Sequence, residues 1–255
     1  MRGKTLNMDL RDQAVSAAIF AEGIWEPGET KFIEQSLQPG MVFVDIGANI
    51  GYYSLIASSL VGSTGKVFAF EPDPKNFGLL QRNVAANQCQ NVFMVQKAVA
   101  AVTRQLPLYR SSDNFGDHRT YEPRDKNVRQ RDSGPAPVAV EAVSLDEYLS
   151  GRLTNVDFIK MDIQGSEYDA LVGMRRTLRQ NPDVTILTEF WPMGLRQAGV
   201  APDHFLDEVK AYGFMVHRLG DEGRPRESSV AEILSGLSGN EYTNLVLSRK
   251  KLPLF

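Results

Sequence analysis

The stretch Val42-Phe-Val-Asp-Ile-Gly-Ala-Asn-Ile-Gly51 decides the fold. Its first residues are mostly β-branched or aromatic and predict a strand, glycines follow, and residues 52–60 have an apolar helical pattern. A strand, a glycine-rich turn and a helix in this order bring backbone N–H groups and a helix N-terminus up to a nucleotide-like ligand. Glycine suits the turn because a Cβ would hinder both the tight bend and the approach of the ligand.

Two classes of cofactor use such a turn, and its neighbours favour S-adenosylmethionine (SAM). The dinucleotide fingerprint is G-x-G-x-x-G/A, whereas this chain reads Gly47-x-Asn49-x-Gly51. Asp45, before the turn, suits the positive ammonium and sulfonium of SAM and would repel a pyrophosphate. Glu71 closes the next predicted strand and could accept hydrogen bonds from both ribose hydroxyls. Each acid alone could be a helix cap or a solvated strand end, but both acids together with the turn indicate SAM.

Several stretches between Trp25 and Phe190 carry a family resemblance. They are Trp25-Glu26-Pro27, Asp45-Ile-Gly-Ala-Asn-Ile-Gly51, Phe70-Glu71-Pro72, Val143-Ser-Leu-Asp-Glu-Tyr-Leu149, Asp157-Phe-Ile-Lys-Met-Asp-Ile-Gln-Gly-Ser-Glu167 and Ile186-Leu-Thr-Glu-Phe190. With them the chain resembles FkbM-type SAM-dependent methyltransferases. Gln164 departs from the family pattern, in which Glu more often precedes the glycine. The resemblance implies O-methylation of a hydroxyl, on a sugar of a glycan, glycolipid or glycosylated natural product.

The order of predicted elements favours an α/β fold. Strands at 42–46, 66–71, 91–97, 156–162 and 184–190 alternate with helices at 50–60, 74–87, 166–179 and 202–212. This predicts a doubly wound, Rossmann-like class I methyltransferase domain with a mostly parallel seven-stranded sheet and an antiparallel C-terminal edge strand. Residues 1–40, with helices at 9–24 and 30–37, are expected to be a helical lead-in or cap, and residues 41–255 the methyltransferase domain. Residues 110–137 lack periodicity and predict either a long functional loop, which could close over the substrate, or a disordered segment.

The predicted sheet brings several charged residues to one rim, because ligands of open α/β sheets bind outside the carboxyl ends of the strands. Those residues are Asp45, Glu71, Lys97, Asp162 and Glu189. Within this group we expect Asp45 and Gly47 to contact the methionine part of SAM, Glu71 the ribose, and Lys97 with Ala98 the adenine edge. The family resemblance adds Glu26, which could approach the ammonium of the cofactor or be an exposed loop acid.

A hydroxyl acceptor needs a general base, since a neutral alcohol is a poor nucleophile. Asp162 ends a predicted strand and Glu167 opens the next helix, so the two carboxylates could flank the acceptor. Glu167 could instead only favour its helix N-terminus. His118, in the long loop, is a third candidate base, or else a solvated histidine. We expect no metal, because strand 184–190 does not end in the Asp-Asn pair that Mg²⁺-dependent enzymes use.

Composition is that of an ordinary globular protein: 255 residues, 42% hydrophobic and 23% charged, with a net charge of −3. The acidic balance argues against a nucleic-acid groove, and no apolar run is long enough to span a bilayer. Cys89 is the only cysteine and the start of the chain has no apolar secretory region, so we expect a cytoplasmic protein. The sequence is compatible with a monomer and with a homo-oligomer.

Two other functions remain to be weighed against methyl transfer. An NAD-dependent oxidoreductase of Rossmann type would need pyrophosphate contacts that Asp45 disfavours, and it would need a catalytic pair that the sequence does not suggest. A non-catalytic SAM-fold module would bind a partner without using the acids at the rim.

Overall fold

The computed structural model describes residues 3–122, 136–152 and 155–252. The strands of its main sheet are β1 (Val42–Ile46), β2 (Lys66–Phe70), β3 (Val92–Val95), β7 (Phe158–Met161), β8 (Thr185–Phe190), β9 (Met215–Leu219), β10 (Pro225–Glu227) and β11 (Thr243–Ser248). They lie in the order β10-β9-β11-β8-β7-β1-β2-β3. The pairs that join β3, β2, β1, β7 and β8 are parallel, so the predicted mostly parallel α/β sheet is confirmed.

Two details of the predicted sheet are wrong. The described residues form eight strands in the main sheet instead of seven, because the short β10 pairs with β9 and takes the outer edge. The antiparallel strand is also not at the edge, since β11 lies between β8 and β9 and pairs antiparallel with both. Placing β11 inside the sheet gives its apolar residues Leu245, Val246 and Leu247 full burial.

The helices are α1 (Val15–Glu22), α2 (Pro27–Ser36), α3 (Tyr52–Val61), α4 (Pro74–Ala86), α6 (Leu145–Leu149), α7 (Glu167–Val172), α8 (Arg175–Gln180), α9 (Pro192–Gln197), α10 (Pro202–Ala211) and α11 (Val230–Ser235). The predicted helix 166–179 is divided into α7 and α8. Gly173 lies at the division, where a Cβ would come within 2.0 Å of the Ala100 carbonyl oxygen, so the chain packs too closely there for a larger residue. The predicted helix 9–24 begins only at Val15.

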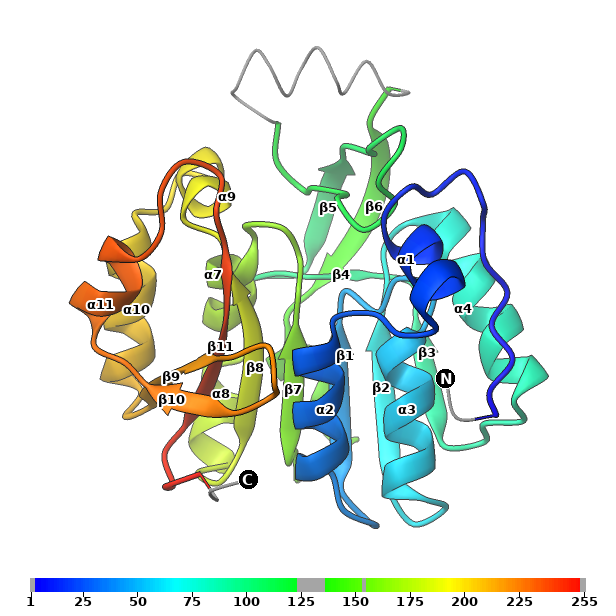
Figure 1. Cartoon of the computed structure of the whole chain (residues 1–255), viewed down its shortest axis with the longest axis horizontal. Helices are drawn as coiled ribbons and strands as arrows, with labels where there is room; N and C mark the ends of the chain where they lie inside the picture. Colours follow the sequence, from blue (N-terminus) through cyan, green and yellow to red (C-terminus); the bar gives the residue numbers. More distant parts are fainter. Residues whose placement is uncertain (1–2, 123–135, 153–154, 253–255) are drawn as a thin grey trace.

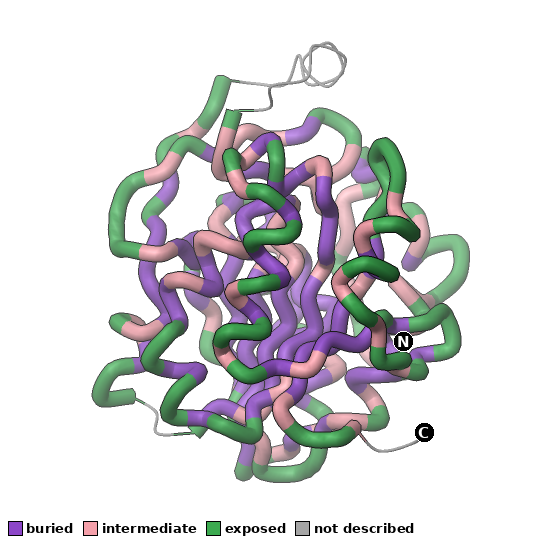
Figure 2. Tube along the Cα trace, turned by 90° about the vertical axis from the view of Figure 1, so that its left-hand side faces the viewer, coloured by how far each residue is buried: buried purple, intermediate pink, exposed green. Residues whose placement is uncertain are grey.

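The side chains of each strand alternate between two apolar cores, one on either face of the sheet. Phe43 and Phe158 stack with ring centroids 5.5 Å apart, in the core shared with α2, α3 and α4. Val44 and Ile159 belong to the opposite core, shared with α7, α8 and α10. Figure 2 shows the strands as a buried centre beneath more exposed connections.

A second, smaller sheet stands beyond the end of the main sheet (Figure 1). Its strands are β4 (Ala98–Val99), β5 (Arg104–Leu108) and β6 (Val138–Val143), in the order β4-β6-β5. The predicted strand 91–97 is therefore shorter, and the chain leaves the main sheet after Val95. Of the predicted loop 110–137, residues 123–135 lie outside the described part of the chain. None of the helices in the described ranges is long and apolar enough to cross a bilayer.

Candidate active site

A cavity of about 300 Å³ lies at the carboxyl ends of the parallel strands. Eight of the predicted site residues line it: Glu26, Gly47, Asn49, Glu71, Lys97, Ala98, His118 and Asp162. Three others, Asp45, Gly51 and Glu167, are set back behind its wall. The cavity extends from the ends of β2 and β4 on one side to the ends of β7 and β8 on the other, as the topology predicted.

The glycine-rich turn between β1 and α3 has left-handed backbone at alternate residues. Gly47 has φ 84°, Asn49 φ 50° and Gly51 φ 89°. Asparagine is among the few residues with a Cβ that tolerate this region, which explains Asn49 between the glycines. A Cβ on Gly47 would lie 2.0 Å from the Asp162 carbonyl oxygen, so this glycine lets the turn pack against the segment after β7.

Asp45 is fully buried beneath the turn. Its Oδ2 accepts a 2.6 Å hydrogen bond from the Ser54 hydroxyl of α3, while Oδ1 has no hydrogen-bond partner among the described residues. Burial raises the pKa of Asp45, and the nearby Lys160 ammonium opposes that rise. Asp45 therefore lies beneath the glycine-rich turn and is not a residue of the cavity wall.

Glu71 joins the two turns that follow β1 and β2. Its Oε2 accepts the Asn49 N–H at 2.8 Å, and its Oε1 accepts the Asp73 N–H at 2.8 Å. A carboxylate has about four lone-pair sites, so both oxygens keep capacity for a ligand. Burial raises the pKa of Glu71 to about 8.

The loop that follows β5 covers the cavity on the side of β2 and α4. The Phe115 carbonyl oxygen accepts hydrogen bonds from the side-chain amides of Asn49 and Asn76, each 2.9 Å long. The Phe115 N–H donates to Asp12 Oδ1 at 3.1 Å, which ties the loop to the segment before α1. Asp12, Asn49 and Asn76 therefore hold residues 111–119 over the glycine-rich turn.

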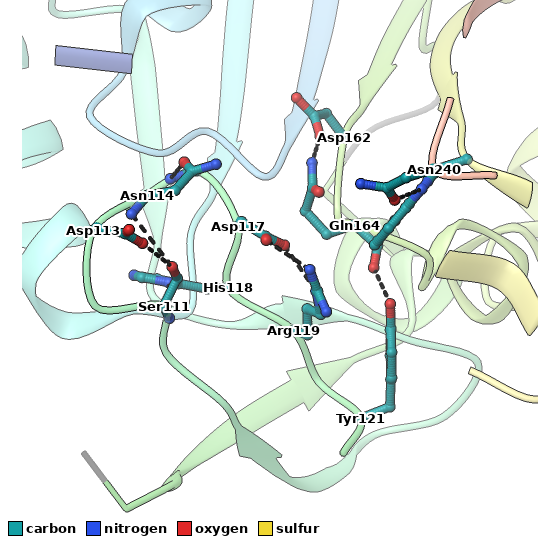
Figure 3. A network of polar contacts seen from close by, with 12 residues as sticks. Ser111, Asp113, Asn114, Asp117, His118, Arg119, Tyr121, Asp162, Gln164 and Asn240 are labelled. Carbon is teal, nitrogen blue, oxygen red and sulfur yellow. Dashed lines mark hydrogen bonds and ion pairs between the residues drawn. The ribbon is translucent and has the colours of Figure 1, made fainter. Parts of the chain in front are cut away.

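His118 belongs to the same side of the cavity. Its Nδ1 accepts the Ser111 N–H at 3.2 Å, and Figure 3 shows it grouped with Ser111 and Asp113. Burial lowers the pKa of His118, and the negative charge of Asp73 is the largest effect that opposes this fall. Lys97 is partly exposed there and pairs with Glu141 at 2.7 Å. The structure thus separates His118 from the acids at the ends of β7 and β8.

Asp162 follows β7 and carries two polar partners. Its Oδ2 lies 3.3 Å from Lys160 Nζ, and its Oδ1 accepts a 2.9 Å hydrogen bond from Gln164 Nε2 (Figure 3). The Gln164 carbonyl oxygen in turn accepts a 2.6 Å hydrogen bond from the Tyr121 hydroxyl. The residue that departs from the family pattern therefore orients the neighbouring carboxylate.

Glu167 opens α7 but is only 1% exposed. Its Oε1 accepts the Ile163 N–H at 3.0 Å, which closes the turn between β7 and α7. Burial raises the pKa of Glu167 to about 7. This position supports the segment that holds Asp162 and does not put Glu167 in the cavity wall.

Glu26 lines the cavity from the start of α2. It has φ 41°, a conformation that residues with a Cβ seldom adopt, and its Oε2 accepts a 2.9 Å hydrogen bond from the Tyr53 hydroxyl. Burial raises the pKa of Glu26 to about 7, and Asp162 adds to the rise. The resemblance-based expectation that Glu26 approaches the cofactor is compatible with this place in the wall.

Sequence reasoning gave no role to several residues that the structure brings to the site: Tyr53, Lys160, Asn240 and Tyr242. Lys160 is 2% exposed, and its ammonium lies 4.5 Å from the centre of the Tyr53 ring. A lysine inside an apolar strand was the available signal for Lys160. Asn240 accepts a 2.8 Å hydrogen bond from the Trp191 indole and comes from a segment with no recognisable pattern.

The residues of the cavity fit SAM. The cofactor needs acceptors for its ribose hydroxyls and negative groups for its ammonium and sulfonium. The cavity wall contains Glu71, whose oxygens keep acceptor capacity, and the acids Glu26 and Asp162. The turn at 47–51 lies at the N-terminus of α3. Glu189 Oε2 is buried without a hydrogen-bond partner in the part of the chain that the structure describes, so the wall contains an unsatisfied acceptor.

Comparison with known families gives a match over most of the described fold. Residues 45–216 match the model of the methyltransferase FkbM domain. Methyltransferase sdnD of Sordaria araneosa is 29% identical over 177 residues, which are 60% of this chain and 68% of that protein. The 2-O-methyltransferase NoeI of Sinorhizobium fredii is 27% identical over 62% of this chain and 70% of its own.

A further relative and one solved structure complete the comparison. The hexuronic acid methyltransferase AglP of Haloferax volcanii is 30% identical over 54% of this chain and 52% of its own. A Streptococcus mutans protein described as a methyltransferase and crystallised in complex with SAH has a TM-score of 0.50 at 11% identity. The alignment covers 88% of this chain and 98% of that one. At that identity the likeness concerns the fold, which is that of class I methyltransferases.

Proposed function

Because the chain belongs to the FkbM family of methyltransferases, whose cofactor is SAM, we propose that it methylates a hydroxyl group of a sugar. Family membership assigns methyl transfer in place of the hydride transfer of a nicotinamide enzyme. The observation that carries the proposal is Asp162, a carboxylate in the cavity wall held by Lys160 and Gln164 at the end of β7.

The wall around Asp162 supports a polyhydroxylated acceptor. Gln164, Thr120 and Asn240 line this end of the cavity together with Trp191 and Tyr242. Amide and hydroxyl groups hydrogen-bond to sugar hydroxyls, while aromatic rings cover their apolar faces. Two of the relatives, described as a 2-O-methyltransferase and a hexuronic acid methyltransferase, support the same acceptor class.

In the proposed reaction SAM supplies the electrophilic methyl group, and the protein aligns the acceptor and removes one proton. Asp162 accepts the hydroxyl proton as the acceptor oxygen forms its new bond to carbon. The Lys160 ammonium, 3.3 Å from Asp162 Oδ2, holds the carboxylate in place. Glu167 is a positioning residue, because its hydrogen bond to the Ile163 N–H holds the turn that follows Asp162.

We also propose that the residues predicted from the sequence to bind the cofactor do so, each at the part of SAM that its place in the cavity allows. The turn is formed by Gly47, Asn49 and Gly51, and the Asp45 carboxyl group lies beneath it. Glu26 lines the same cavity. Glu71, Lys97 and Ala98 hold the nucleoside end. His118 lies at the nucleoside end as well, so we propose that it contacts the cofactor and that it is not the general base.

The test is a set of p-nitrophenyl glycosides of a neutral hexose, a 6-deoxyhexose, an N-acetylhexosamine and a hexuronate, incubated with SAM and the protein. We expect a product one methyl group heavier for at least one glycoside, and a rate about 10²–10⁴-fold lower for Asp162→Asn. Asp169→Asn, an exposed acid paired with Arg104, is the matched control and should keep the full rate. Methylation of amines but of no glycoside would remove the proposed acceptor class.

A further inference from the structure

Glu189 differs from the other acids in the cavity wall. It is the next-to-last residue of β8 and its Oε2 is buried without a hydrogen-bond partner among the residues that the structure describes. Glu26 has the Tyr53 hydroxyl, and Asp162 has Lys160 and Gln164. A buried carboxylate oxygen without a donor is costly, which indicates a group that a ligand completes.

The charges around Glu189 are mostly negative. The carboxyl groups that act on it most are Asp162, Glu167, Glu26 and Glu29, and with burial they raise the pKa of Glu189 well above its usual value. The positive groups at this end are Lys160, which pairs with Asp162, and Arg119, which pairs with Asp117 and lies over the Trp191 ring. Burial, together with the charges of Glu26, Glu189 and Asp162, raises the pKa of Tyr242 to about 12.

We propose that Glu189 is a cofactor-recognition residue whose carboxylate answers the positive charge on the sulfur of SAM. A cation next to Glu189 interacts with the unpartnered oxygen and also reduces the repulsion among the acids. A neutral hydrogen-bond donor interacts with the oxygen but leaves the repulsion unchanged. Glu189 lines the same cavity as the glycine turn and Glu26, within one continuous wall. The inference concerns the cofactor and does not depend on the acceptor proposed above.

The proposal has a consequence for the reaction cycle. When the methyl group leaves, the electron pair of the carbon–sulfur bond stays on sulfur and the sulfonium becomes a neutral thioether. The attraction to Glu189 therefore ends when the product SAH forms. A site built in this way binds the charged cofactor SAM more tightly than its neutral product SAH.

The test is calorimetric titration of wild-type protein and Glu189→Gln with three ligands: SAM, SAH, and sinefungin, which carries an amine cation in place of the sulfonium. We expect the substitution to weaken SAM and sinefungin about tenfold and to change SAH less than about twofold. Glu227→Gln makes the same change of charge at an exposed residue of β10 and should leave all three affinities unchanged.

Equal losses for all three ligands would show a merely structural role for Glu189 and overturn the proposal. Unchanged affinities would overturn it too, and would leave the free oxygen to an acceptor hydroxyl. Glu189→Asp keeps the charge, so its ratio of SAM to SAH affinity should stay close to the wild-type ratio.

A measurement on the wild-type protein decides the matter even if Glu189→Gln does not fold. Titrations at pH 7.5 in phosphate and in Tris, which differ in ionisation enthalpy, give the number of protons released on binding. We expect SAM to release more protons than SAH, because a nearby cation favours ionised carboxylates. Equal release by the two ligands would contradict the proposal.

Discussion

Lys160 Nζ lies 3.3 Å from Asp162 Oδ2, two residues further along the chain at the carboxyl end of β7. Burial alone would lower the pKa of Lys160, but Asp162, Glu29, Glu26 and Asp45 together raise it above its usual value. The lysine therefore stays charged inside the protein. It compensates a group of acids that reaches from beneath the cofactor turn to the acceptor end of the cavity.

Lys160→Met should leave those acids without their central cation. Removing one partner of a buried ion pair costs roughly 3–5 kcal/mol, so we expect a loss of that order in the free energy of unfolding, measured by urea denaturation. The control is Lys250→Met, which breaks an exposed pair with Asp183 and should cost less than about 1 kcal/mol. Equal stability of the two variants would show that the acids are protonated without Lys160.

The stability of the protein should fall as the pH rises, through Glu71. The pKa of Glu71 is about 8 in the folded protein against 4.5 for the free side chain. Because the folded state holds this proton more tightly, the stabilisation is complete below about pH 4.5 and is lost as the pH approaches 8, on the order of several kcal/mol. We expect a lower unfolding temperature at pH 8.5 than at pH 5.5. Glu71→Gln should flatten that dependence, and a variant curve parallel to the wild-type curve would exclude Glu71 as its source.

Gly47→Ala should be severely destabilising. The new Cβ would lie 2.0 Å from the Asp162 carbonyl oxygen and the residue would keep a φ of 84°. We expect a loss of at least roughly 2 kcal/mol, measured by thermal unfolding, together with weaker SAM binding. Gly78→Ala, inside α4 and with open space at its Cβ, should be neutral or stabilise by up to about 1 kcal/mol. A tolerated Gly47→Ala would mean that the segment after β7 can move away from the turn.

Asn76→Ala should loosen the cover of the cavity. It removes one of the two amides that donate to the Phe115 carbonyl oxygen, a bond worth roughly 0.5–1.5 kcal/mol. Hydrogen exchange of the amides at 111–119 should become several-fold faster. Asn87→Ala removes hydrogen bonds with Thr5 and Asn83 at the other end of α4 and should leave this segment protected. Exchange that is equally fast in both variants would assign the effect to α4 as a whole.

The parallel half of the sheet could be predicted from the sequence because its signals are local. β1 and β2 have apolar, β-branched or aromatic runs that end in an acid, and α4 begins at Pro74 after Asp73, whose side chain caps it as the local pattern indicates. Alternating strands and helices at this spacing allow few topologies. The sequence could therefore predict that the acids at the strand ends lie together at the carboxyl edge of the sheet. The position of β11 was not predictable in this way, since insertion between β8 and β9 is decided by pairing across long sequence distances.

The site was predictable where a residue's role follows from the end of a strand. Glu71 and Asp162 are in the cavity wall for that reason. Asp45 follows the same rule but is buried beneath the turn, where its carboxyl group accepts a hydrogen bond from Ser54. Glu167 was predicted from its place at the start of a helix, and its side chain folds back onto the Ile163 N–H instead of entering the cavity. The partners of His118 depend on how the loop folds back onto Asn49 and Asn76, and no periodic pattern records that contact.

The place of β11 inside the sheet has a consequence for how the protein forms during synthesis. Until residues 243–248 emerge from the ribosome, β8 and β9 each lack the neighbour that β11 provides in the folded protein, and each presents an open edge. The last wall of the cavity, with Tyr242 beside Glu189, is then incomplete as well. A nascent chain that stops short of β11 should expose these strand edges and depend on chaperones, and it should gain the ability to bind its cofactor only after β11 has been made.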